Sequence, residues 1–188
     1  MTRARPVLRL VAALLLGAAP LFGLAVSGPA HAYVYSTREQ LLAAFFPASA
    51  EVAAQRFRPD PERFRAALGY APPKESWDIQ VGRQGGVVSG YAVFDQQLGQ
   101  HEPIDFAVWL DAAGLVGRVE VMVYREPYGD GVRAAAFRRQ FEGLGPASPM
   151  RPGREIKVVS GSTISTQALS VGVRRAAVLV DLLRAEGG

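Results

Sequence analysis

Cysteine is absent from the 188-residue sequence, and histidine occurs only twice, at His31 and His101. Without cysteine the chain forms no disulfide bond, carries no thiolate nucleophile and holds no iron–sulfur cluster through its own thiolates. With so little histidine, a metal site would have to be built from carboxylates, and we predict none. Redox chemistry, if the protein performs it, must therefore come from a bound organic cofactor.

The N-terminus has the layout of a secretory signal. Three arginines and no acidic residue lie within the first nine positions, and an apolar run follows over residues 10–26. Ala30 and Ala32 flank His31 in the small-x-small pattern of a cleavage site. We predict that residues 1–32 are a signal peptide and that the mature protein is exported, to the periplasm or another extracytoplasmic space. If the run is retained instead, it forms a membrane anchor.

The mature chain lacks an excess of either charge. Removing residues 1–32 takes three of the 21 basic residues and none of the 17 acidic ones, which leaves 18 against 17. The arginines alternate with acids along most segments, so no basic stripe is available for a phosphate backbone. We therefore expect no nucleic acid among the partners. The remaining 156 residues suit one domain with one core.

The pattern of the mature chain predicts an α+β fold. A capping box at residues 36–39 predicts a helix that Pro47 ends, and Asp60 with Pro61 predicts a second helix that stops near Gly69. We therefore assign residues 33–75 to an N-terminal helical segment and residues 76–188 to the main part of the domain. Neither helix carries residues that indicate chemistry, so both are expected to serve in packing.

Alternation of apolar and polar residues then predicts four strands. They cover residues 77–82, 87–94, 104–110 and 115–125. The turn at residues 111–114 makes the pairing of the last two strands the safest expectation. Helical spacing returns at residues 132–141 and again over 165–184. The expected architecture is a single domain in which helices flank a central antiparallel sheet.

A segment rich in hydroxyl groups precedes the last predicted helix. It consists of Ser160, Gly161, Ser162, Thr163, Ile164 and Ser165. The simplest interpretation is a helix N-cap. The alternative is an anion site, because free amides at a helix N-terminus beside a glycine suit a phosphate group. A threonine hydroxyl at that place is positioned to be phosphorylated or flavinylated.

Two further segments lie where predicted strands end. Residues 99–104 contain His101, and a lone histidine is more often structural than functional. Residues 124–133 contain Glu126, Tyr128 and Gly129. They form either a plain strand-to-helix turn or a loop whose aromatic rings and arginine flank a planar ligand. None of the three segments decides the function alone.

Together, the three segments resemble the FMN-binding domain proteins related to the flavin-carrying subunits of the sodium-translocating NADH:quinone reductase and of Rnf-type complexes. The Ser-Gly-Ala-Thr-x-Ser/Thr acceptor motif of that family is matched by residues 160–165. The Gly-Lys-His-Glu-Pro-Ile turn and the Tyr-Arg-Glu-x-Tyr-Gly loop of its small exported branch are matched by residues 99–104 and 124–129. The resemblance covers most of the mature chain.

The resemblance implies an electron carrier rather than a stand-alone enzyme. FMN would be attached to Thr163 by a phosphoester bond, which a separate flavin transferase forms from FAD with Mg²⁺. The partners would be this transferase and membrane or periplasmic redox proteins. The residues expected at the cofactor are Ser160, Gly161, Ser162, Thr163, Ile164, Ser165, His101, Glu126, Tyr128 and Gly129.

The sequence also departs from the family pattern. Lys157 occupies the place of an aspartate three residues before the motif serine, so it reverses a charge that the transferase would read, or else it neutralises the FMN phosphate. Ser162 replaces an alanine and Gln100 a lysine. The competing hypothesis is a non-redox exported module that binds another anionic ligand or a protein. A serine hydrolase has little support because Gly-x-Ser-x-Gly is absent.

Overall fold

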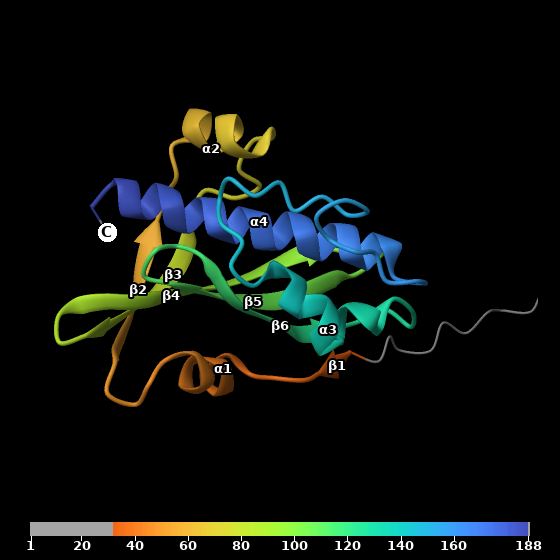
Figure 1. Ribbon diagram of the computed structural model, residues 1–188, viewed down its shortest axis with the longest axis horizontal. Helices are drawn as coiled ribbons and strands as arrows, with labels where there is room; N and C mark the ends of the chain where they lie inside the picture. Colours follow the sequence, from red (N-terminus) through yellow and green to blue (C-terminus); the bar gives the residue numbers. More distant parts are fainter. Residues whose placement is uncertain (1–31, 188) are drawn as a thin grey trace, which may run out of the picture.

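A computed structural model describes residues 32–187, so the predicted signal peptide lies outside the described residues except for Ala32. The chain forms one α+β domain (Figure 1). Its strands are β1 (Tyr33–Val34), β2 (Glu51–Phe57), β3 (Trp77–Gln84), β4 (Val87–Leu98), β5 (Pro103–Asp111) and β6 (Val116–Tyr124). Its helices are α1 (Arg38–Phe45), α2 (Pro61–Leu68), η1 (Asp130–Arg133), α3 (Ala135–Arg138), η2 (Arg139–Phe141) and α4 (Thr163–Ala185).

All six strands join one antiparallel sheet in the order β1-β6-β5-β4-β3-β2. The predicted pairing of the strands around residues 104–110 and 115–125 is confirmed, because β5 pairs with β6. The turn between them is closed by Asp111, whose carboxylate accepts a hydrogen bond from Leu115 N at 2.9 Å. Gly114 supplies the positive φ of 83° that this turn requires.

Helices cover the two faces of the sheet unequally. The long helix α4 runs along one face, and α2 lies on the outer side of α4 (Figure 1). The predicted apolar side of α4 faces the sheet and is buried, as expected for Leu169, Val173 and Leu183. On the opposite face, the short helix α1 covers only a small cluster around Leu41 and Phe45. The main core therefore lies between α4 and the sheet.

The structure differs from the sequence-based expectations in three places. The segment 33–75 contains α1 and α2 but also β1 and β2, so the sheet has six strands rather than four. Strand β2 escapes detection because most of its side chains are exposed, so it lacks apolar alternation, and its pairing with β3 defines it. The predicted helix over residues 132–141 is broken at Ala134, whose extended ψ of 131° separates η1 from α3.

The third difference is a shift of one residue at the start of α1. The N-cap is Thr37, which forms a capping box with Gln40, instead of Ser36 with Glu39. Both pairs satisfy the same spacing rule, and the helix selects the pair one residue later. In the part of the chain that the structure describes, no helix has both the length and the apolar character needed to cross a bilayer.

Candidate functional site

The three segments singled out in the sequence meet at the N-terminus of α4. They surround a cavity of about 250 Å³ that is lined by Gln100, Glu126, Tyr128, Gly129 and residues 161–165. Gln100 comes from the turn after β4, and Glu126, Tyr128 and Gly129 come from the loop after β6. Residues 161–165 are the first three residues of α4 and the two that precede it. Residues more than 60 positions apart in the sequence thus share one site.

No side chain caps the start of α4, although the preceding segment is rich in hydroxyl groups. The first backbone hydrogen bond of α4 runs from Thr166 N to Ser162 O, at 2.8 Å. The amides of Thr163, Ile164 and Ser165 precede it and belong to the set that has no partner within the helix. The helix dipole adds partial positive charge at the same place. This end of α4 therefore has the chemistry of an anion site.

The hydroxyl groups of this segment differ sharply in exposure. Ser162 is 4% exposed, Ser165 2% and Thr166 0%, so all three are enclosed by the fold. Thr163 and Ser160 are exposed. Of the two, Thr163 lines the cavity and Ser160 does not. Among the hydroxyl-bearing residues of this segment, Thr163 is therefore the one that both lines the cavity and is exposed to an external enzyme.

Tyr124 joins the loop after β6 to the start of α4. Its side chain is fully buried, its hydroxyl donates to Tyr128 O at 2.6 Å, and the same oxygen lies 2.8 Å from Ser165 Oγ. Burial raises the pKa of Tyr124, so the phenol stays protonated and remains a donor at neutral pH. Tyr124 opens the loop whose aromatic rings were expected to flank a planar ligand, but its ring is buried and does not line the cavity. Here it fixes two walls of the cavity.

Two glycines let the same loop approach α4 closely. A Cβ atom on Gly129 would lie 2.6 Å from the Tyr124 hydroxyl and 2.7 Å from Ser165 Oγ, and the φ of Gly129 is 91°. A Cβ atom on Gly131 would lie 2.6 Å from a methyl carbon of Val159 and 2.9 Å from Ser162 Oγ. Any larger residue would push the loop away from α4, so these glycines define the width of the cavity.

Glu126 joins the loop to the turn that contains His101. Glu126 is 8% exposed, and its Oε1 accepts hydrogen bonds from His101 N at 2.5 Å and from Glu102 N at 3.1 Å. A Cβ on Gly99 would come within 2.9 Å of the same oxygen. Glu126 thus lines the cavity and also holds the neighbouring turn in place. A carboxylate paired with two amides is a stable arrangement for a buried charge.

The other residues that were predicted to contact the cofactor lie either at the rim of the cavity or outside it. Tyr128 is 82% exposed and Ile164 48%, so they present apolar surface at the rim. His101 contributes its backbone amide to the site, but its imidazole is exposed and does not line the cavity. Lys157 is exposed, and its backbone is held by Gln140 through bonds of 2.7 and 3.3 Å. Its side chain does not line the cavity either.

A phosphate ester carrying a larger planar group fits this donor set. The free amides of α4 suit the phosphate, and the exposed Thr163 hydroxyl suits the ester bond. The cavity is smaller than the roughly 300–1,000 Å³ of sites that enclose whole ligands. A cavity of this size could enclose a phosphate group but not a larger group attached to it. Among residues 32–187, no group of three or more histidine, aspartate or glutamate side chains is arranged to bind a metal ion.

Comparison with known proteins adds no family assignment, because no protein-family model and no curated protein matches this chain.

Proposed function

We propose that this protein is an extracytoplasmic electron carrier that binds FMN through a phosphoester bond to Thr163. The observation that carries the proposal is the position of Thr163. Its exposed hydroxyl lies beside the free amides of α4, in a cavity that also contains the Glu126 and Tyr128 loop. The motif resemblance and the meeting of three distant segments around one cavity both support this proposal.

The attachment step leaves all oxidation states unchanged. The Thr163 oxygen forms a bond to the phosphorus on the FMN side of FAD, and the P–O bond of the pyrophosphate breaks. AMP leaves, and the hydroxyl proton passes to a base of the flavin transferase. The exposure of Thr163 supports this role, because a second protein must reach the hydroxyl, whereas Ser162, Ser165 and Thr166 are enclosed.

The residues of the chain have separate tasks in this proposal. The amides of residues 163–165 hold the phosphate, and Tyr124 and Gly129 keep the loop close to them. Tyr128 and Ile164 offer apolar contact at the rim, where one edge of the ring system stays accessible to a redox partner. When bound, FMN supplies reversible electron transfer, and the protein sets its environment. A covalent bond prevents loss of the cofactor in a space that has no flavin pool.

Co-expression with a flavin transferase in an exporting host tests the proposal. The purified protein should be yellow, and peptide mass spectrometry should find the FMN phosphate adduct on Thr163. Thr163→Ala should remove the adduct. Ser160→Ala is the matched control, because Ser160 is the other exposed hydroxyl of the motif and does not line the cavity. It should leave labelling intact.

Other outcomes separate the alternatives. An adduct that survives Thr163→Ala would place the attachment elsewhere. If a standard family member is labelled under the same conditions and this protein is not, Lys157→Asp should restore labelling. Failure of that variant would end the covalent hypothesis. A colourless protein that also takes up no free FMN would favour the non-redox binding module.

A further inference from the structure

Large apolar side chains gather at the end of the domain where the candidate site lies. Among residues 32–187, nine large apolar side chains are exposed to solvent. Six of them, between 40% and 82% exposed, lie at this end, and we call them the end patch: Tyr33, Val34, Leu98, Tyr128, Val158 and Ile164. Exposed apolar residues that are scattered singly need no explanation, but a concentration of them marks an interaction surface.

Four residues of the end patch lie at the candidate site or beside it. Tyr128 and Ile164 line the cavity. Tyr33 and Val34 form β1, and Tyr33 pairs with Tyr124, the last residue of β6. The hydroxyl of Tyr124 donates to Tyr128 O at 2.6 Å. Strand β1 therefore lies next to the loop that carries Tyr128.

The other two residues of the end patch come from segments that reach the same site. Leu98 ends β4, and the turn that follows it contributes Gln100 to the cavity. Val158 directly precedes Val159, which lies against η1. All six residues are therefore at the end of the domain that contains β1 and the N-terminus of α4 (Figure 1).

The point at which the chain enters the fold indicates which partner covers this surface. Residues 1–32 are predicted to direct export, and their apolar run ends at residue 26. Only residues 27–32 separate that run from Tyr33 in the end patch, and such a segment spans at most about 20 Å. Because a signal or an anchor of this kind lies in the membrane during export, the end patch is held close to the bilayer surface.

The residues at this end suit the interface of a bilayer. Tyr33 and Tyr128 have the amphipathic rings that are enriched where a membrane meets water. Lys157 is exposed and forms no ion pair among residues 32–187, so it is available to anionic headgroups. The exposed carboxylate of Asp130 is paired with Arg133 at 3.4 Å, which reduces its repulsion of such lipids.

We propose that the end patch docks the exported protein on a lipid bilayer, so that the cavity at Thr163 lies at the membrane surface. This docking needs only the exposed side chains and does not depend on the flavin. If FMN is bound as proposed, its accessible edge lies where a membrane redox protein can reach it. A second copy of this chain is the competing occupant of the end patch.

Co-sedimentation with vesicles of phosphatidylcholine and phosphatidylglycerol in equal parts tests this proposal. The purified exported protein should pellet with the vesicles, and the double variant Val34→Ser with Leu98→Ser should bind them at least tenfold more weakly. Neither residue lines the cavity at Thr163, so flavin attachment should be unchanged. The matched control is Val52→Ser with Val87→Ser, because both valines are exposed and lie near the turn between β3 and β4. This control should bind like the parent protein.

A fluorescent label shows which end of the domain meets the bilayer. The sequence has no cysteine, so a single introduced cysteine can carry an environment-sensitive dye. Emission from a dye on Val158→Cys should move to shorter wavelength when vesicles are added, and emission from a dye on Val87→Cys should not. Equal shifts at both positions, or none at either, would refute docking through this end.

Two further outcomes would also overturn the proposal. If the parent protein does not pellet with the vesicles, or if the end-patch variant and its control lose binding equally, the end patch does not bind a bilayer. A dimer in sedimentation velocity that Val34→Ser with Leu98→Ser dissolves, without any vesicle binding by the parent protein, would assign the end patch to a second copy. Flavin attachment to Thr163 would remain possible in each case, so the two proposals can fail separately.

Discussion

At Gly129 the loop after β6 lies close to α4, and a substitution there tests whether this close approach is required. An alanine there meets a φ of 91° and two oxygen atoms, at 2.6 and 2.7 Å from its Cβ. We expect Gly129→Ala to lower the free energy of unfolding by about 2 kcal/mol, because strain and steric overlap add. The same variant should reduce flavin attachment. Urea denaturation and in-gel flavin fluorescence measure the two effects.

Gly161 provides the control for this prediction. It also has a positive φ, of 76°, but a Cβ atom there would meet no atom within 4 Å. Gly161→Ala should therefore show only the backbone cost of about 1 kcal/mol. If the two variants lose equal stability, close approach of the loop is not what Gly129 provides.

Glu126 gives a second prediction at the residue scale. Its Oε1 is the acceptor for two backbone amides of the turn after β4. Glu126→Ala leaves both amides unpaired, so we expect a loss of about 2–3 kcal/mol in unfolding free energy. Glu126→Gln keeps a carbonyl acceptor and should lose less than half as much. Hydrogen exchange should locate the effect at residues 99–102, and equal losses for both variants would contradict the proposed role.

At the scale of elements, a buried ion pair joins α4 to β4. Arg175 and Asp95 are each 4% exposed at the side chain and lie 2.9 Å apart. Arg175 also donates to Gln97 Oε1 and Gln96 O, while Asp95 accepts from Lys74 and Trp77. Removing one partner of such a pair leaves an uncompensated buried charge. The network thus fixes where α4 lies along the sheet.

We expect Asp95→Ala to cost about 3–5 kcal/mol in unfolding free energy. The double variant Asp95→Leu with Arg175→Met should cost less than Asp95→Ala alone, because it leaves no unpaired buried charge; Lys74, which also pairs with Asp95, is 46% exposed at its side chain. Chemical denaturation of the three proteins measures this difference. A double variant that loses as much stability as Asp95→Ala, or more, would show that the unpaired Arg175 charge is not the cause of the loss.

The elements also show why some predictions succeeded. Proline and glycine are start and stop signals for helices, and α2 begins at Pro61 after Asp60 and ends before Gly69, as predicted. The β5 and β6 hairpin follows from the Asp111 turn and from alternating apolar residues. Strand β2 carries no such local signal, because most of its residues are exposed and do not alternate between apolar and polar. Its backbone is extended because it pairs with β3. In such segments, pairing with another strand determines the secondary structure, and the local sequence does not.

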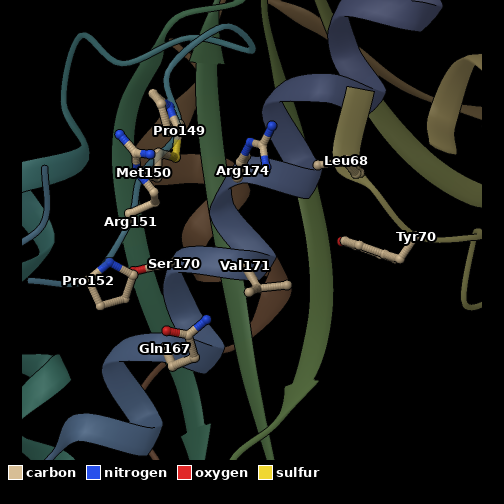
Figure 2. Close-up of a pocket in the computed structure, with 10 residues that line it drawn as sticks. All are labelled: Leu68, Tyr70, Pro149, Met150, Arg151, Pro152, Gln167, Ser170, Val171 and Arg174. Atoms are coloured by element: carbon tan, nitrogen blue, oxygen red, sulfur yellow. The ribbon is translucent and has the colours of Figure 1, made fainter. Parts of the chain in front are cut away.

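The candidate site, too, could be predicted only in part from the sequence. The motif segments were visible in the sequence because each combines glycine with hydroxyl or charged residues. Their meeting around one cavity depends on the order of β4, β5 and β6, which no single segment encodes. A second cavity, on the outer side of α4, was not predicted at all (Figure 2). Its residues Ser170 and Arg174 appear in the sequence as ordinary polar positions of an amphipathic helix, and only packing against α2 and residues 149–152 gives them a shared cavity.

At the scale of the whole molecule, the chain enters the fold beside the candidate site. Tyr33 in β1 pairs with Tyr124 in β6, and Tyr124 contacts Ser165 in α4. The other end of α4 carries the C-terminus, at the opposite end of the sheet (Figure 1). The site and the N-terminal edge of the domain therefore share one end of the molecule.

The pH dependence of stability depends on carboxylates distributed over the whole domain. Burial, the largest single influence, acts to raise the pKa of Asp95, but the charges of Arg175 and Lys74 and the hydrogen bonds from Lys74 and Trp77 together lower it below its usual value. Hydrogen bonds from the side chain and backbone of Arg151 lower the pKa of Glu155 from 4.5 to about 2. A carboxylate whose pKa is lowered by folding contributes stability above its unfolded pKa and loses it as pH falls through the folded value.

We therefore expect stability to stay level from neutral pH down to about pH 4.5 and to fall between pH 4.5 and 2. Asp95 should dominate the fall because it is enclosed, whereas solvent screens the exposed pair of Glu155 and Arg151. The acid limb should consequently be shallower in Asp95→Asn and nearly unchanged in Glu155→Gln. Urea unfolding at half-unit pH intervals measures these slopes. An acid limb as steep in Asp95→Asn as in the parent protein would show that groups other than the buried ion pair govern acid unfolding.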